Sequence, residues 1–289
     1  MTMADIRAID AHVHFWDPSV LDYPWLAAEP TLGRAFLPGD FEPLRSRSVD
    51  ALIFVEANCA TGQAVREVEW VDRLAADEPR IAGIVAFVDL LDEPRRDDAL
   101  ARLGQGRRVV GVRHNIQRQA TGFALQPAFV RGVQAVGVAG YPFDLCVTAD
   151  QLAEVVALVE RCPEATFVLD HCGKPAIRDE EFDTWAAQLE RLASNESVSC
   201  KISGLLTESR EDQRNAQALA PWVEHARGCF GASRLLYGSD WPVSTLGGGA
   251  GRWRAIVDEI TSSWPDAERR ALFAENATRT YGLAVPVDG

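Results

Sequence analysis

The 289-residue sequence predicts an α/β fold, a single distorted (β/α)8 barrel with its functional site at the C-terminal ends of the strands. The first observation is a series of eight short apolar runs, at residues 6–11, 51–55, 81–88, 109–112, 141–147, 165–169, 198–202 and 235–237. The second is that helical patterns separate these runs, which predicts right-handed βαβ units and a parallel sheet. Eight repeats favour a closed barrel, and an open doubly wound sheet remains the alternative.

The segments between the runs have the apolar spacing of amphipathic helices. Four stripes carry it: Val65, Val68, Trp70 and Leu74; Leu152, Val155, Val156 and Val159; Phe182, Trp185, Leu189 and Leu192; and Leu219, Trp222, Val223, Ala226 and Phe230. The second stripe follows Thr148 and Gln151, which have the spacing of a capping box. No linker rich in proline, glycine or serine divides the chain, so we expect one domain over residues 1–289.

Composition and charge limit the classes of function. Hydrophobic residues make up 47% and charged residues 25% of the chain, as in a globular protein with a full core. The net charge of -13 argues against nucleic acid or an anionic membrane as a partner. No signal peptide or run of about 18 apolar residues is recognised. The six cysteines include no Cys-x-x-Cys pair, which favours reduced thiols in the cytoplasm. The oligomeric state stays open.

Two histidines stand at the end of the first apolar run. His12 and His14 are spaced i, i+2, and on a strand this spacing directs both imidazoles to the same side. The same pattern also occurs in ordinary strands, where one ring is a hydrogen-bonded core group. Aromatic residues and prolines follow the pair, as the wall of a pocket would need.

Polar residues also stand at the ends of nearly all the remaining runs. They are Glu56 and Asn58 after the second run; Arg113, His114 and Asn115 after the fourth; Asp144 at the fifth; Asp170, His171 and Lys174 after the sixth; Lys201 and Ser203 at the seventh; and Ser239, Asp240 and Trp241 after the eighth. Such side chains are costly to bury one by one. Because barrel chemistry takes place at the C-terminal ends of the strands, a shared polar site explains this pattern better than chance.

Asp240 and His171 are the strongest candidates after the histidine pair. A carboxylate at the eighth strand lies beside the first strand when a barrel closes, although Asp240 could instead cap the next helix. His171 precedes a Gly-Lys-Pro turn and should face the barrel mouth, although it could be a core histidine bonded to the backbone. Arg113 suits a carboxylate or a polarised carbonyl, and an ion pair with Asp144 or Asp170 is nearly as plausible.

Other residues fit a structural role better. Alternation along the strand turns His114 away from Arg113, and His225 lies within a helical pattern. The Gly238-Ser239-Asp240 segment is not the nucleophile elbow of α/β hydrolases. The glycine-rich stretch 246–251 does not complete a dinucleotide-binding motif, so we expect a mobile loop over the barrel mouth.

The sequence resembles the amidohydrolase superfamily, in its group of sugar-acid and pyrone dicarboxylate lactonases. The matching segments span nearly the whole chain in order: Ile9-Asp10-Ala11-His12-Val13-His14-Phe15-Trp16, Tyr23-Pro24-Trp25-Leu26, Val55-Glu56-Ala57-Asn58, Gly111-Val112-Arg113, Leu169-Asp170-His171-Cys172-Gly173-Lys174-Pro175, Leu236-Tyr237-Gly238-Ser239-Asp240-Trp241-Pro242 and Glu275-Asn276-Ala277-Thr278-Arg279. The resemblance implies a distorted (β/α)8 barrel that hydrolyses a cyclic ester, such as a fucono- or rhamnono-lactone.

The resemblance also implies roles for the polar residues. Larger members of the superfamily hold two metals through a carboxylated lysine and a further histidine, whereas this chain has Arg113 and Asp144 at the corresponding strands. It therefore implies at most one zinc ion. The implied ligands are His12, His14, His171 and Asp240, with Glu56 as an alternative, and catalysis without a metal stays open.

For ester hydrolysis, Asp240 is the expected base that activates water, while the three histidines, directly or through a metal, stabilise the oxyanion. Arg113, Lys174 and Glu56 are expected to bind the substrate, and Trp16, Trp25 and Trp241 to offer flat faces to a sugar ring. Two other functions stay open: a zinc-dependent decarboxylase of an unsaturated carboxylic acid, and a barrel that binds sugar acids without catalysis.

Overall fold

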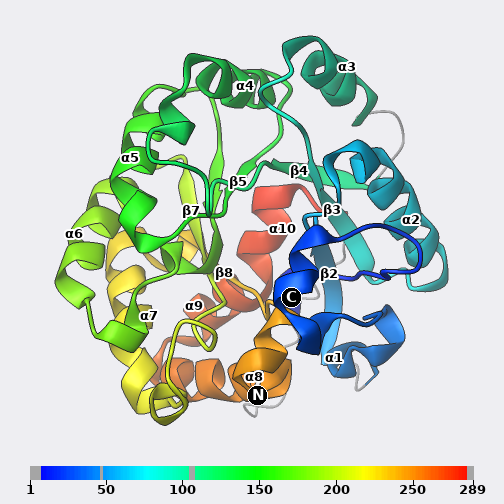
Figure 1. The fold of residues 1–289 in the computed structure, drawn as a ribbon. Coiled ribbons are helices and arrows are strands. Elements are labelled where there is room, and N and C mark those ends of the chain that lie inside the picture. The colour runs from blue at the N-terminus through cyan, green and yellow to red at the C-terminus, as the bar shows by residue number, and fades with distance from the viewer. Residues whose placement is uncertain (1–7, 46–47, 104–107, 285–289) are drawn as a thin grey trace.

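The computed structural model describes residues 8–45, 48–103 and 108–284. Its centre is one sheet of eight parallel strands in the order in which they occur along the chain (Figure 1). The strands are β1 (Ala8–Val13), β2 (Val49–Val55), β3 (Ile81–Phe87), β4 (Val109–Arg113), β5 (Phe143–Leu145), β6 (Phe167–Leu169), β7 (Val198–Ile202) and β8 (Leu235–Tyr237). The first expected strand began at Ile6, and residues 6 and 7 lie outside the described residues. The expected barrel is confirmed.

The barrel closes where the last strand meets the first. Val13 and Trp241 form a parallel bridge just beyond β8. The backbone N–H of Asp240 donates to the carbonyl of His12 at 2.9 Å, and that of His14 donates to the carbonyl of Trp241 at 2.7 Å. These bonds bring the segment after β8 alongside the histidine pair, as the closed form of the fold requires.

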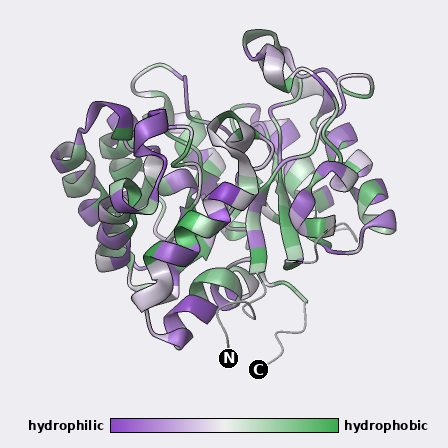
Figure 2. Cartoon of the chain, turned by 90° about the horizontal axis from the view of Figure 1, so that it is seen from below, coloured by the Kyte–Doolittle hydropathy of each residue, from purple (hydrophilic) through white to green (hydrophobic). Residues whose placement is uncertain are grey.

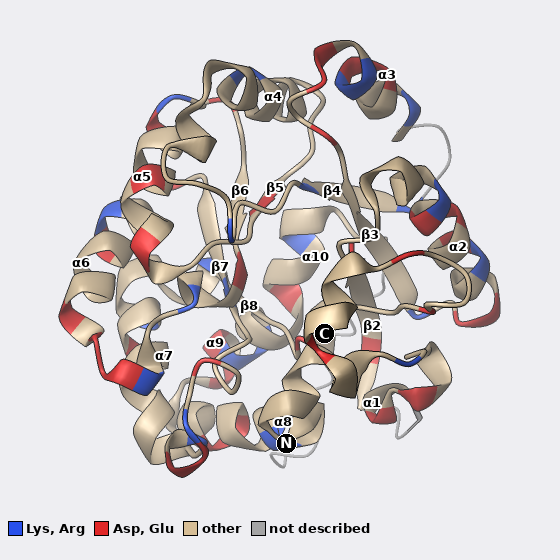
Figure 3. Ribbon diagram, in the orientation of Figure 1, with Lys and Arg blue, Asp and Glu red and all other residues tan. Residues whose placement is uncertain are grey.

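Helices surround the sheet on the outside and, with α10, cover one end of it (Figure 1). They are α1 (Glu42–Arg45), α2 (Ala64–Asp77), α3 (Glu93–Leu103), α4 (Pro127–Val138), α5 (Leu152–Glu160), α6 (Phe182–Ala193), α7 (Ala216–Phe230), α8 (Gly249–Ile260), α9 (Asp266–Arg270) and α10 (Asn276–Tyr281). The four expected apolar stripes lie in α2, α5, α6 and α7. Their apolar faces turn inward, while Lys, Arg, Asp and Glu gather on the outer helices (Figures 2 and 3). We propose that this arrangement is a single domain, because one continuous core joins strands and helices.

Apolar side chains fill the barrel interior at the end opposite the polar strand ends. Ile9, Ile53 and Val85 pack there with Leu236 and with Tyr281 of α10. Gly111 lies opposite the Tyr281 ring, and a Cβ atom at residue 111 would come within 3.2 Å of that ring. Helix α10 therefore closes one end, and polar side chains occupy the other.

The glycine-rich stretch 246–251 was expected to be a mobile loop, and that expectation is wrong. A short 3-10 helix, Val243–Gly247, leads directly into α8. Gly248 takes a φ of 111°, which favours glycine, and a Cβ at Gly247 would lie 2.6 Å from Cβ of Leu206. The glycines thus serve a tight turn and a close backbone approach. In the described part of the chain, no helix combines the length and apolarity needed to cross a membrane.

Candidate active site

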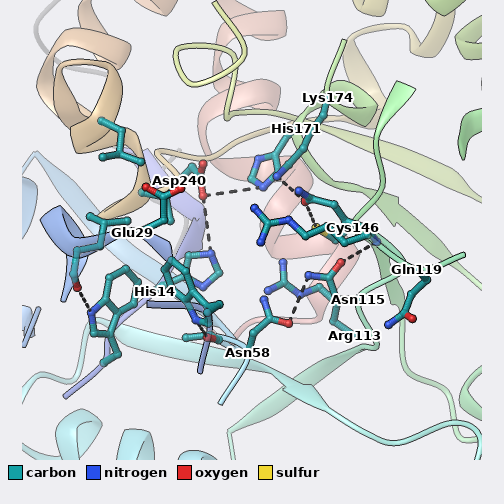
Figure 4. A pocket seen from close by; sticks show the side chains of 18 residues that line it. His14, Glu29, Asn58, Arg113, Asn115, Gln119, Cys146, His171, Lys174 and Asp240 are labelled. Carbon is teal, nitrogen blue, oxygen red and sulfur yellow. Dashed lines mark hydrogen bonds and ion pairs between the residues drawn. The ribbon is translucent and has the colours of Figure 1, made fainter. Parts of the chain in front are cut away.

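Four predicted side chains converge at the C-terminal end of the barrel. The Nε2 atoms of His12 and His14 lie 3.1 Å apart. Oδ1 of Asp240 lies 3.9 Å from Nε2 of His12, 3.7 Å from that of His14 and 3.9 Å from that of His171. Figure 4 shows His14, His171 and Asp240 pointing toward one another. All four residues are buried, with side-chain exposures of 8% or less.

Strict alternation along β1 does not explain why the side chains of His12 and His14 point into the barrel. Ile9 and Ala11 already pack in the barrel interior, so strict alternation would direct His12 outward. The pairing of β1 with β2 shifts register between Asp10 and Val13. This irregularity changes which residues face inward, as a β-bulge does, and it turns the side chains of His12 and His14 toward His171 and Asp240. We call the group of these four side chains the cup.

The contacts of Nδ1 in each imidazole ring orient the ring and direct its Nε2 atom into the site. Nδ1 of His14 donates to the carbonyl of Val55 at 2.7 Å, so its Nε2 carries a lone pair. Nδ1 of His171 lies 2.8 Å from Oγ of Ser203. Nδ1 of His12 lies 3.1 Å from Oδ1 of Asp170. Nζ of Lys201, which can only donate, lies 3.2 Å from the same Nδ1, and Nε2 of His12 lies within hydrogen-bond distance of Nε2 of His14.

This donor set fits a divalent metal. Burial lowers the pKa of His12 to about 3 and holds the pKa of His14 and His171 well below the usual value. The three rings are therefore neutral at pH 7, the form in which imidazole binds metals. Donor atoms of His12, His171 and Asp240 lie within 4.8 Å of one another. The Nε2 atoms of His12 and His14 lie 3.1 Å apart, close enough for both to bind one cation.

Asp240 has the properties of a base for neutral pH. Burial raises the pKa of its carboxyl group to about 7, Lys174 opposes this shift, and Asp170 adds to it. Its side chain does not cap the following 3-10 helix, where no side-chain cap is formed. A pKa close to the working pH is what a proton-transfer group needs.

Backbone strain concentrates around the same cavity. Seven described residues other than glycine have a positive φ. Five of the seven line the cavity: Asn58, Arg118, His171, Lys174 and Asp240. Such conformations persist only where the surrounding structure enforces them, and they gather at functional sites.

The cavity above the cup has a volume of about 320 Å³, within the range of small-molecule sites. Trp16 and Trp25 line one wall. The indole N–H of Trp25 donates to the carbonyl of Ala57 at 2.8 Å, which fixes the ring. Trp241 packs instead between Phe36 and Phe41 in the aromatic core and is not part of the lining.

Arg113 and Glu56 form a buried pair at the edge of the cavity. Nε of Arg113 donates to Oε1 of Glu56 at 2.6 Å, and Nη1 donates to Oδ2 of Asp170 at 3.1 Å. The ion pair with Asp170, which the sequence left open, is therefore formed. Arg113 lines the cavity, whereas Glu56 lies behind it with 1% exposure. Lys174 also lines the cavity and donates to Oε1 of Gln117 at 2.6 Å.

Two groups of residues at this site had no specific role in the expectations from the sequence. Amide side chains of Asn58, Asn115, Gln117 and Gln119 line the cavity and can bind hydroxyl groups. Beneath the cup, Nζ of Lys201 lies 2.5 Å from Oδ2 of Asp144 and 3.0 Å from Oδ1 of Asp170. The hydroxyl of Tyr281 donates to Asp144 at 2.9 Å. Polar residues at the ends of the fifth, sixth and seventh runs were the available signal for this network.

The buried carboxyl group of Glu67, in α2, makes the free energy of unfolding depend on pH. Burial and the neighbouring Glu56 raise the pKa of Glu67 from 4.5 to about 8. The folded protein therefore holds a proton that the unfolded chain releases above pH 4.5, and stability falls as the pH rises through this window. Glu67→Gln should raise the melting temperature at about pH 9 and change it little at about pH 5, since each pKa unit corresponds to about 1.4 kcal/mol. An equal change at both pH values in thermal unfolding would contradict this.

Comparison with known proteins gives a consistent result. A family model described as Amidohydrolase matches residues 9–283. An L-fucono-1,5-lactonase of Burkholderia multivorans is 35% identical over 295 residues, covering 97% of each chain. An L-fucono-1,5-lactonase of Burkholderia ambifaria is 32% identical, covering 96% of each chain.

Solved structures agree with these relatives. A Burkholderia multivorans amidohydrolase with bound zinc has a TM-score of 0.85 at 34% identity, covering 96% of this chain and 99% of that chain. A 2,6-dihydroxybenzoate decarboxylase has a TM-score of 0.65 at 15% identity, covering 96% of this chain and 98% of that chain, a likeness of fold alone. The decarboxylase alternative therefore has no better support than the hydrolase.

Proposed function

The chain belongs to the amidohydrolase family, and from this premise we propose that it opens the cyclic ester of a sugar-acid lactone by attack of water. Relatives named as L-fucono-1,5-lactonases, matched over nearly their whole length, support an aldonolactone as the substrate. The observation that carries the proposal is the placement of Asp240, whose pKa of about 7 suits a base, within 4 Å of three neutral imidazoles beside the cavity.

In the proposed reaction, Asp240 takes a proton from a water molecule as the water oxygen bonds to the lactone carbonyl carbon. The carbonyl electron pair moves to the carbonyl oxygen and a tetrahedral intermediate forms. When this intermediate collapses, the bond from that carbon to the ring oxygen breaks, and Asp240 returns the proton to the ring oxygen. The product is the open hydroxy acid, which loses its own proton at neutral pH.

The remaining cavity residues bind and orient the substrate in this proposal. Lys174 and the amides of Asn115 and Gln117 are placed to bind ring hydroxyls. Trp25 offers apolar surface to the sugar ring, and the fully buried Trp16 packs edge-on against it from behind. Arg113 holds the wall through its ion pairs with Glu56 and Asp170.

We further propose that the divalent metal is a single zinc ion, held by His12, His14, His171 and Asp240. Nitrogen and carboxylate donors suit zinc, and the structurally similar amidohydrolase of Burkholderia multivorans is described with bound zinc. When bound, such an ion supplies Lewis-acid polarisation of the carbonyl group. Glu56 is not among the proposed ligands, because its two carboxylate oxygens accept hydrogen bonds from Arg113 and from the backbone N–H of Asn58.

The proposed place of action is the cytoplasm. Cys146, Cys162, Cys172 and Cys200 are buried as free thiols, and such residues persist in a reducing compartment. A small-molecule lactone is the proposed partner, in keeping with the acidic net charge of the chain.

A substrate screen tests this function. Purified protein is assayed with a pH indicator against 1,4- and 1,5-aldonolactones and pyrone dicarboxylates, and we expect acid release with an aldonolactone. Carbon dioxide release from an unsaturated carboxylic acid without lactone turnover would favour the decarboxylase. Tight binding of a sugar acid without turnover of any lactone would favour a binding protein.

The same assay tests the metal. The bound metal is measured before and after treatment with a chelator, and we expect the lactonase rate to fall on chelation and to recover when zinc is added. An unchanged rate at zero metal content would contradict the zinc proposal and leave the lactonase proposal intact.

A further inference from the structure

A second cluster of metal-binding side chains lies between two outer helices. Glu190 comes from α6, and His225 and Cys229 come from α7. Nε2 of His225 lies 3.4 Å from Sγ of Cys229 and 3.8 Å from Oε1 of Glu190. Donor atoms of all three lie within 4.8 Å of one another. The catalytic cup shares none of these residues, so the cluster is separate from lactone hydrolysis.

The helices place these three side chains together for simple reasons. His225 and Cys229 are spaced i, i+4, so they lie on the same face of α7 one turn apart. The His225 ring packs edge-on against Phe182 and is tilted against Trp185, with ring centroids 5.4 and 5.3 Å away. These contacts orient the imidazole toward the thiol and the α6 carboxylate. The side chain of His225 is 20% exposed and that of Glu190 is 66% exposed, so a cation in solvent can reach the cluster.

We propose that Glu190, His225 and Cys229 form a binding site for a borderline-soft divalent cation of the zinc class, with a fourth position open to water. In a tetrahedral zinc site, metal–sulfur bonds of about 2.3 Å and metal–nitrogen bonds of about 2.0 Å separate the two donor atoms by roughly 3.5 Å. The observed distance of 3.4 Å between Sγ and Nε2 is close to this value. Sulfur and imidazole donors disfavour magnesium and calcium, which prefer oxygen.

The cluster is less easily explained as a reactive cysteine. Burial and the neighbouring Glu190 raise the pKa of the Cys229 thiol to about 11, so it is a poor nucleophile at neutral pH. Nε2 of His225 also lies 3.3 Å from the carbonyl of Ala186. That carbonyl lies inside α6, where a backbone N–H one turn later also donates to it, so it keeps a partner when the imidazole proton moves through solvent to Nδ1 and leaves the Nε2 lone pair for a cation. Binding forms bonds to sulfur, nitrogen and oxygen and releases the thiol proton to solvent.

A cation bound here would join α6 to α7. Because it binds the folded state and finds the three ligands separated in the unfolded chain, it stabilises the fold by mass action. The proposed role is therefore a structural clamp on the outside of the barrel, independent of the substrate.

Cobalt(II) titration tests the site, because cobalt bound to a thiolate has a charge-transfer absorption that cobalt bound only to imidazole and carboxylate lacks. We expect wild-type protein whose catalytic cup already holds zinc to develop this absorption as one further equivalent of cobalt binds. Cys229→Ser should abolish it. His225→Gln and Glu190→Gln should each weaken cobalt binding by about tenfold or more, since even outer-shell changes cost about that much.

Matched controls separate this cluster from other thiols. Cys59→Ser changes the other half-buried cysteine, and Cys146→Ser changes the cysteine that lines the catalytic cavity. Both variants should keep the absorption. Zinc should raise the melting temperature of these controls, and Cys229→Ser should lose the part of the rise that belongs to the clamp. Absorption that persists in Cys229→Ser, or that is unchanged in both His225→Gln and Glu190→Gln, would overturn the proposal.

Discussion

Replacing Asp240 with asparagine should lower kcat for lactone hydrolysis by about a thousandfold, within the range that a proton-transfer group contributes. The amide keeps the size of the side chain but cannot accept the proton of the attacking water. It also cannot return that proton to the ring oxygen. The loss should appear in kcat and in kcat/KM alike, because proton transfer takes place in the transition state. Initial rates with the aldonolactone found in the screen measure both constants.

Two further measurements make this expectation specific. In the zinc-loaded wild type, kcat/KM should rise with pH and reach its plateau below pH 7, because the base must be unprotonated and a zinc ion on the carboxylate would hold the pKa of Asp240 below the value of about 7 that burial gives it. Asp89→Asn is the matched control, since Asp89 follows β3 outside the cavity lining. It should keep near-wild-type rates. A folded Asp240→Asn protein with a rate within a few-fold of wild type would rule out Asp240 as the base.

The repeating architecture could be predicted from sequence because each strand and helix carries its own local pattern. The runs at 198–202 and 235–237 coincide with β7 and β8, and the other six expected runs overlap β1 to β6. The expected capping box also forms, with the backbone N–H of Thr148 donating to Oε1 of Gln151 at 3.1 Å. Since each βα unit repeats the same periodicities, the number of units indicated the barrel.

The candidate site was predictable where a polar residue comes soon after the end of its strand. His171 and Asp240 lie two and three residues beyond the ends of β6 and β8, and both face the cup. The roles of these residues stay predictions. For His12 and His14 the expected common direction is found, but a register shift in β1 turns both rings into the cup, and the sequence shows no sign of that shift.

The features of the site that could not be predicted depend on contacts between segments that are distant in sequence. Trp241 was expected to face a sugar ring, whereas Phe15, Phe36 and Phe41 surround it in the core. Which face of an aromatic ring is covered depends on segments that fold over it, and the sequence pattern of residues 236–242 contains no such information. The partners of Lys201 likewise come from β5, from the segment after β6 and from α10, far away along the chain.

The largest effect on stability should come from Lys201→Met. Lys201 is fully buried and its Nζ faces Asp144, Asp170 and Nδ1 of His12. Although burial disfavours its charge, the two carboxylates raise the pKa of Lys201, so the network contains a charged lysine. Removing one partner of a buried ion pair costs about 3 to 5 kcal/mol, because the remaining charges are left uncompensated. Urea unfolding should show a loss of this size in the free energy of unfolding.

The chain contains a natural control for this change, since its other lysine is Lys174. Lys174→Met removes a half-buried ammonium group that donates to Gln117, and it should change the free energy of unfolding by less than about 1 kcal/mol. The double variant Lys201→Met with Asp144→Asn should recover part of the lost stability, because it removes a carboxylate that has lost its countercharge. Asp144 already has a pKa raised to about 6, which burial causes and Lys201 opposes. Without Lys201 this pKa should rise further, so the loss in the single variant should grow as the pH increases above 6. A small loss that does not depend on pH, or no recovery in the double variant, would show that the lysine does not balance these carboxylates.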